Sequence, residues 1–161
     1  MSTTRQTVAL GLFIGACLLA AAIGSLATAS SVGTWYAGIE KPAWTPPGWV
    51  FGPVWTVLYI MMGAAAWLVW REGALRDKAT AGALTAFGVQ LGLNIAWSFI
   101  FFGARSPGWA FAEILALLAA IGVTTALFAR ISTAASALMA PYLVWVVFAS
   151  VLNFAIWRMN V

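Results

Sequence analysis

The chain has 161 residues, of which 63% are hydrophobic and 7% are charged, whereas about a quarter of the residues in an ordinary soluble domain are charged. Such a chain cannot cover itself with a polar surface, so its outside must face lipid and a soluble fold is excluded. The net charge of +4 comes from eight basic and four acidic residues that form no basic cluster, which gives nucleic-acid binding no support.

Five apolar stretches are each close to the roughly 20 residues that a helix needs to cross a bilayer. A tryptophan and a cation adjoin at several of their ends, as at Trp70 and Arg71, which is typical of a helix end among lipid headgroups. The sequence therefore predicts an all-α integral membrane bundle in which 1–161 is a single domain, with helices at about 8–30, 51–70, 79–102, 109–129 and 134–157.

The first stretch, 8–30, has two interpretations. Arg5 precedes it and Ala27-Thr28-Ala29 resembles a cleavage site, as in a secretory signal. The stretch is longer than the apolar part of a usual signal, which favours a retained helix.

Short loops that are rich in Lys and Arg tend to lie in the cytoplasm. In the five-helix arrangement, five cations fall on the N-terminal side of the membrane and three on the other, so we expect a cytoplasmic N-terminus. The two sets are Arg5, Arg71, Arg76, Lys78 and Arg130, and Lys41, Arg105 and Arg158.

The segment 31–50 between the first two helices is long and is rich in Trp, Pro and Gly rather than in charge. A flexible linker has a different composition. The segment is either an ordered lid over the mouth of the bundle or a belt at headgroup depth, and the sequence favours neither. Its aromatic residues and prolines are Trp35, Tyr36, Trp44, Trp49, Pro42, Pro46 and Pro47.

In the third helix, Gln90, Asn94, Trp97 and Ser98 share one face. Polar side chains that face lipid are costly, so this face must look into the bundle. Two roles are open: the amides of Gln90 and Asn94 could join helices by hydrogen bonds, or they could line a binding pocket.

Two other helices carry similar aromatic stripes with a few polar groups. Core packing could explain any one stripe, but three such faces in a small bundle are typical of an apolar pocket for a flat small molecule. The stripes are Trp55, Tyr59 and Met62 in the second helix, and Tyr142, Trp145, Val146, Ala149 and Asn153 in the fifth.

Few residues could carry acid–base or metal chemistry. Histidine is absent and Cys17 is the single cysteine, which excludes an intrachain disulfide and a Cys-based zinc site and leaves ordinary hydrolytic catalysis unsupported. Glu113 is the one acid well inside an apolar stretch, and it could serve function or anchor the helix end near Arg105. We therefore expect no metal site and no required cofactor, and one intramembrane acid makes a channel or pump the weakest hypothesis.

Three long segments resemble the translocator protein family, also called tryptophan-rich sensory proteins or peripheral benzodiazepine receptors. They are WYAGIEKPAWTPPGWVFGPVWTVLY at 35–59, QLGLNIAWSFIFF at 90–102 and PYLVWVVFASVLNFAIWR at 141–158. The likeness extends from the first loop to the C-terminus and includes the five-helix layout.

The resemblance implies a five-helix bundle that binds porphyrins, haem-type tetrapyrroles, sterols and isoquinoline ligands in a pocket under the first loop. It also implies a homodimer in a bacterial cell membrane. By position, Trp55 and Trp145 resemble the tryptophans implicated in porphyrin binding and light-dependent breakdown. Further lining positions are Trp35, Tyr36, Asn94, Ala149 and Asn153.

We therefore expect a tetrapyrrole-binding protein that acts in sensing or transport, with light-dependent porphyrin degradation through the pocket tryptophans as the alternative. Sterol binding ranks lower, because the family's sterol motif needs a tyrosine where this chain has Phe154. The expected ligand-contacting residues are Trp35, Tyr36, Trp44, Trp55, Tyr59, Gln90, Asn94, Trp97, Tyr142, Trp145, Ala149 and Asn153.

Overall fold

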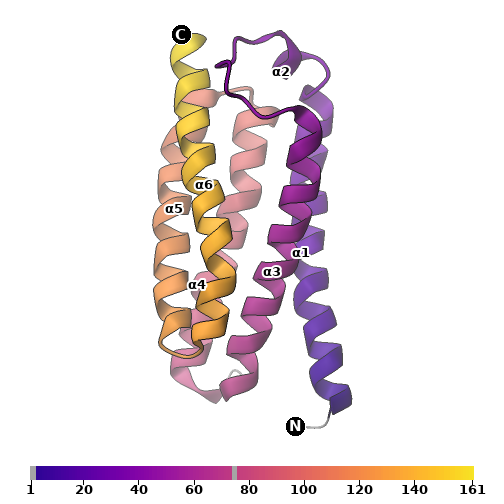
Figure 1. Cartoon of the computed structure of the whole chain (residues 1–161), viewed down its shortest axis with the longest axis vertical. Helices are drawn as coiled ribbons and strands as arrows, with labels where there is room; N and C mark the ends of the chain where they lie inside the picture. The colour runs from indigo at the N-terminus through magenta and orange to yellow at the C-terminus, as the bar shows by residue number, and fades with distance from the viewer. Residues whose placement is uncertain (1–2, 74–75) are drawn as a thin grey trace.

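The computed structural model describes residues 3–73 and 76–161, and all regular secondary structure in these ranges is helical. Five long helices run along one axis as a bundle, with the N-terminus at one end and the C-terminus at the other (Figure 1). The helices are α1 (Thr3–Ser31), α3 (Gly48–Gly73), α4 (Lys78–Ser98) with its π-helical continuation Phe99–Gly103, α5 (Pro107–Ala129) and α6 (Thr133–Met159). All five are long and apolar enough to span a bilayer, which confirms the predicted membrane bundle.

Each helix extends past its predicted apolar stretch at one or both ends. At about 1.5 Å per residue, the 26 residues of α3 reach about 39 Å, more than the roughly 30 Å of hydrocarbon. Charged residues such as Arg71 and Lys78 lie in these extensions. The extra turns therefore lie in the headgroup region, where a helix can contain charged residues and its ends cannot be predicted from hydropathy.

Side chains at the loops fix where two helices begin. The carboxylate of Asp77 accepts a 2.8 Å hydrogen bond from the backbone N–H of Thr80 and so caps α4. This bond holds the pKa of Asp77 below its ordinary value. At α6, Ser132 Oγ accepts from the N–H of Ala135 at 3.3 Å.

The N-terminal half of α1 packs tightly on α3. Gly63 of α3 faces the α1 backbone, and a Cβ added there would lie 2.6 Å from the Cα of Ile14. The rings of Phe13 and Trp70, 6.1 Å apart, extend the contact toward the N-terminus. The two backbones can approach this closely because residue 63 has no side chain.

The C-terminal half of α1 packs instead on α4 and the π-helix. A Cβ added at Gly24 would lie 3.2 Å from Oγ of Ser98, and Ser31 Oγ donates a 2.6 Å hydrogen bond to the backbone oxygen of Phe102. Along its length α1 therefore changes partner, from α3 to α4 and the π-helix.

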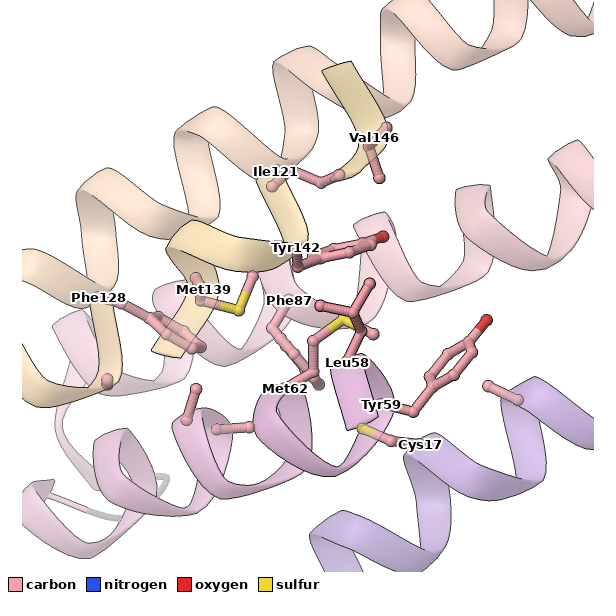
Figure 2. Close-up of a cluster of buried hydrophobic side chains, with 14 of the residues drawn as sticks. Cys17, Leu58, Tyr59, Met62, Phe87, Ile121, Phe128, Met139, Tyr142 and Val146 are labelled. Carbon is pink, nitrogen blue, oxygen red and sulfur yellow. The ribbon is translucent and has the colours of Figure 1, made fainter. Parts of the chain in front are cut away.

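The packed core lies in the part of the bundle away from the 32–47 loop. Phe87 and Phe128 stack there at 5.9 Å between ring centroids, and Met139 packs in the same cluster. In Figure 2 the hydroxyls of Tyr59 and Tyr142 both point away from Phe128 and Met139. These two tyrosines form the boundary between the core and the opposite end of the bundle.

The loop between α1 and α3 is ordered and lies across one end of the bundle, the end that also holds the C-terminus (Figure 1). It contains the short helix α2 (Trp35–Gly38). Tyr36 of this helix packs edge-on against Phe102 of the π-helix, with centroids 5.4 Å apart. Such contacts indicate that the 32–47 loop lies over the bundle rather than only among headgroups, and we call this loop the cover.

Two sets of hydrogen bonds hold the cover in place. Asn160, just after α6, accepts from the N–H of Glu40 at 3.0 Å and donates to the oxygen of the same residue at 2.9 Å. Lys41 Nζ donates to the backbone oxygens of Tyr36 and Ile39 at 2.7 and 2.9 Å. The first set joins the cover to α6, and the second fixes the turn after α2.

The close contact at Gly63 predicts opposite effects for the same substitution at two helical glycines. Gly63→Ala places a methyl group against the backbone of Ile14 and should lower the free energy of unfolding by about 1–3 kcal/mol, as overpacking does. Gly122→Ala meets no atom within 4 Å and should be neutral or stabilising, since alanine favours helix. Thermal unfolding in one detergent tests both, and equal melting temperatures would contradict the close contact.

Candidate ligand-binding site

A cavity of about 560 Å³ lies between the packed core and the cover, within the volume range of small-molecule sites. Four of the spanning helices and the cover contribute to its walls. The lining residues are Leu18, Ala21, Ala22, Gly24, Ser25, Thr28, Val32, Tyr36, Gly48, Phe51, Gly52, Trp55, Thr56, Tyr59, Asn94, Trp97, Ser98, Phe101, Phe102, Trp145, Ala149, Leu152, Asn153 and Ile156.

Tryptophans from two helices meet at one wall of the cavity. Trp55 of α3 and Trp145 of α6 are perpendicular, with ring centroids 6.4 Å apart. Phe51, one helical turn before Trp55, packs edge-on against Trp145 at 5.9 Å. The spacing of four residues in α3 brings Phe51, Trp55 and Tyr59 to the same face. Two members of the expected stripe, Trp55 and Tyr59, thus reach this wall, whereas Met62 lies in the packed core.

The π-helix forms a second aromatic wall. Its wider turn is closed by the bond from the N–H of Ala104 to the oxygen of Phe99, at 2.7 Å. Trp97 stacks on Phe101 at 5.1 Å, and Phe101 packs edge-on against Phe102 at 4.8 Å. Two successive residues, Phe101 and Phe102, thereby reach the lining.

A chain of buried hydrogen bonds forms the floor. Tyr59 Oη donates to Asn94 Oδ1 at 2.6 Å, Asn94 Nδ2 donates to Tyr142 Oη at 2.7 Å, and Tyr142 Oη donates to Gln90 Oε1 at 2.9 Å. Gln90 Nε2 in turn lies 3.9 Å from Met62 Sδ. The chain joins α3, α4 and α6. It also gives hydrogen-bond partners to buried hydroxyls and amides, which would be costly to leave unpaired inside a membrane.

A second polar joint closes the cavity near the start of α5. Trp97 Nε1 donates to Asn153 Oδ1 at 2.9 Å, and Asn153 Nδ2 donates to the oxygen of Pro107 at 2.8 Å. Like the side chain of Asn94, the side chains of Trp97 and Asn153 donate their hydrogen bonds to other groups of the protein. Among the described lining residues, none carries a formal charge.

Tyr36 is the residue of the short helix α2 that lines the cavity, and its side chain ends in a phenol. Burial raises the pKa of this phenol above its ordinary value, so it stays protonated. The cavity therefore offers aromatic faces, a few hydroxyls and amides, and no ionic partner.

Eight of the twelve expected ligand-contacting residues lie in this lining: Tyr36, Trp55, Tyr59, Asn94, Trp97, Trp145, Ala149 and Asn153. Gln90 and Tyr142 do not line the cavity and are the inner members of the hydrogen-bonded chain. Trp35 and Trp44 do not line the cavity. Trp35 packs on Phe101, and Trp44 packs on Phe148. Asn94 thus lines the cavity and also joins helices, while Gln90 joins helices without reaching the lining.

Sequence reasoning missed the contribution of α1 and of the π-helix. Phe101 and Phe102 belong to an aromatic run that could have drawn attention, but no local pattern indicates the wider turn that exposes both. Ala22 and Ser25 line the cavity because of where α1 packs, and small residues in an apolar helix give no signal of their own.

Glu113 lies beyond the first turn of α5 and outside the lining. Both of its carboxyl oxygens are buried and have no hydrogen-bond partner among the described residues. The described residues show an ion pair between Arg71 and Glu72 and none between Glu113 and Arg105. A role for Glu113 in anchoring the helix end therefore gains no support.

Comparison with known proteins gives matches over nearly the whole chain. A family model described as the TspO/MBR family matches residues 13–158. The tryptophan-rich protein TspO of Archaeoglobus fulgidus is 46% identical over 140 residues, 85% of this chain and 87% of the relative. The human translocator protein is 46% identical over 127 residues, 78% and 75% of the two chains. The TspO protein of Chlorobaculum tepidum is 43% identical over 156 residues, 97% and 98% of the two.

The hydrogen-bonded floor predicts a selective effect of removing one hydroxyl. Tyr142→Phe leaves Asn94 Nδ2 without its acceptor and Gln90 Oε1 without its donor, and should lower the free energy of unfolding by about 1 kcal/mol or more. Tyr36→Phe removes a hydroxyl that bonds to no described residue and should leave stability unchanged. Equal thermal unfolding of the two variants would show that the floor does not stabilise the bundle.

Proposed function

Because the chain belongs to the TspO/MBR family, we propose that it binds porphyrin or haem-type tetrapyrroles in the aromatic cavity and acts in their sensing or transport. The observation that carries the proposal is the wall made by Trp55 and Trp145, whose rings lie 6.4 Å apart beside a cavity of about 560 Å³. Flat aromatic ligands bind such walls by stacking and by burial of apolar area.

The chemistry of the lining supports recognition through the macrocycle itself. The chain has no histidine, and Cys17 is buried outside the lining, so neither of these residues offers an axial ligand to a bound iron. Uncharged walls also favour the apolar ring over its carboxylates, which would have to remain at the edge of the cavity. Sterols and isoquinoline-type ligands are also largely apolar, and they rank below tetrapyrroles in the proposal.

The proposal includes the setting of the protein. We place it in a bacterial cell membrane as a homodimer with the N-terminus in the cytoplasm. The positions of the Lys and Arg residues support this orientation. Five of them lie at the N-terminal end of the bundle and three at the covered end.

Replacing the two wall tryptophans should weaken porphyrin binding. We expect Trp55→Phe and Trp145→Phe each to lower the affinity for protoporphyrin IX by roughly threefold to tenfold, because an aromatic contact contributes about 0.5–1.5 kcal/mol beyond its area. Saturable quenching of tryptophan fluorescence measures the affinity. Trp109→Phe is the matched control, since Trp109 is 76% exposed and does not line the cavity. Absence of saturable quenching in the unmodified protein would exclude the proposal.

A second candidate function is light-dependent degradation of the porphyrin. The contact of Trp55 with Trp145 at the cavity wall favours it, because a tryptophan beside an excited porphyrin can give up an electron. Dioxygen would be the oxidant: its two oxygen atoms would end in the opened porphyrin ring, and the electron given up by the tryptophan would return to it before the next turnover.

Illumination tests this candidate. In air, the porphyrin-loaded protein should form a new absorbing product, at a rate that falls at least tenfold in Trp145→Phe. The control is again Trp109→Phe, with the rate compared at equal porphyrin occupancy. Loss of porphyrin absorbance at the same rate in both variants, with no new product, would indicate simple photobleaching.

A further inference from the structure

We infer that the cavity exchanges its ligand sideways with the bilayer, through an opening between the C-terminal half of α1 and the N-terminal half of α3. The inference rests on the proposed function, and it adds the path and the physical state of the ligand. The occupant of the opening is a plate-like tetrapyrrole whose apolar ring is dissolved in the hydrocarbon.

The exposed part of the lining locates the opening. Lining residues that are also exposed indicate where the cavity opens to the outside. All exposed lining residues belong to α1, to α3 or to the residue after α1: Leu18, Ala22, Ser25, Val32, Gly48, Gly52 and Thr56. The lining residues of α4, the π-helix and α6 are all buried or half-buried.

The packing of α1 explains why the opening lies there. At Gly63 and Ile14 the two helices are in backbone contact, and beyond this point α1 turns to α4 and the π-helix, where Gly24 and Ser98 meet. The space between α1 and α3 is therefore left without a helix to fill it. A Cβ added at Gly52 would meet no atom within 4 Å.

Small side chains keep the opening wide. Ala22 and Ser25 line it from α1, and Gly52 and Thr56 line it from α3. The hydroxyls of Ser25 and Thr56 donate to the backbone of their own helices, at 2.7 and 2.9 Å. The residues at the mouth thus present a largely apolar surface to a passing ligand, and their hydroxyls need no hydrogen bond from it.

The depth of the opening places it beside hydrocarbon. Gly52 and Thr56 lie about 6 and 12 Å along the axis from Gly48, the first residue of α3. Ser25 lies about 9 Å before the end of α1 at Ser31. Because the helices are longer than the hydrocarbon core, these positions lie at the boundary between headgroups and hydrocarbon or inside the hydrocarbon, and not in water.

The alternative path, from water through the cover, is closed by specific bonds. Asn160 holds the backbone of Glu40 through two hydrogen bonds, and Lys41 holds the oxygens of Tyr36 and Ile39. Opening this path would break the two Asn160 bonds that join the cover to α6. The lateral path requires no bond to break.

Kinetics of ligand exchange test the two paths in the full-length protein reconstituted into lipid nanodiscs. The probe is protoporphyrin IX dimethyl ester, which is uncharged and partitions into the bilayer, and stopped-flow tryptophan quenching gives the rate constants of association and dissociation. Gly52→Leu should narrow the mouth and lower both rate constants together, by tenfold or more. Gly122→Leu is the matched control at an open helical glycine outside the lining, and it should leave both unchanged.

Two further variants keep the test decisive. Ala22→Leu narrows the mouth from the α1 side and should reproduce the slowing if Gly52→Leu fails to fold. Asn160→Ala releases the cover and should leave both rate constants within twofold of those of the unmodified protein.

The outcomes separate the path from the function. Unchanged rate constants in both narrowed variants, or a tenfold acceleration in Asn160→Ala, would overturn the lateral path while porphyrin binding stands. A weakened affinity caused only by faster dissociation in the narrowed variants would also overturn it, since it would make these positions ligand contacts rather than a mouth. No saturable quenching in the unmodified protein would instead remove the proposed function.

Discussion

The hydrogen-bonded chain from Tyr59 through Asn94 and Tyr142 to Gln90 is the constraint on which the rest of the bundle depends. Hydrocarbon offers polar groups no partners, so side chains of this kind must find them on neighbouring helices. The chain sets the separation of α3, α4 and α6 at one level of the membrane. On one side of it aliphatic and aromatic residues pack densely, and on the other side the same helices enclose a cavity.

The cavity stays open because its walls are large rings that rest on one another. Trp55 packs edge-on against Trp145, and Trp97 stacks on Phe101, so each ring is held by a neighbour rather than by filling the centre. The π-helix adds to this by presenting two successive phenylalanines to the same space. Rigid aromatic walls of this kind are preformed for a flat ligand, which lowers the entropy cost of binding.

Hydropathy and helical spacing were enough to predict the five spans and half of the aromatic lining, because both properties are local in sequence. The face that holds Asn94 and Trp97 had to point inward whatever its neighbours were. The sequence could not separate Asn94, which reaches the cavity, from Gln90 one turn away, since that depends on where Tyr142 of another helix lies. Nor could it predict the role of α1, whose small residues gain meaning only from the change of packing partner beyond Gly63.

The polar joints at Asn94 and Asn153 have a consequence for selectivity. Their amides are committed to Tyr59, Tyr142, Trp97 and Pro107, so few fixed donors or acceptors remain to read the functional groups of a guest. Discrimination among guests then depends on outline and thickness, and apolar pockets separate molecules that differ by one small group only weakly. On the proposed function, such a chamber would accept chemically unrelated compounds of similar shape, and the membrane's content of these compounds would set which of them occupies it.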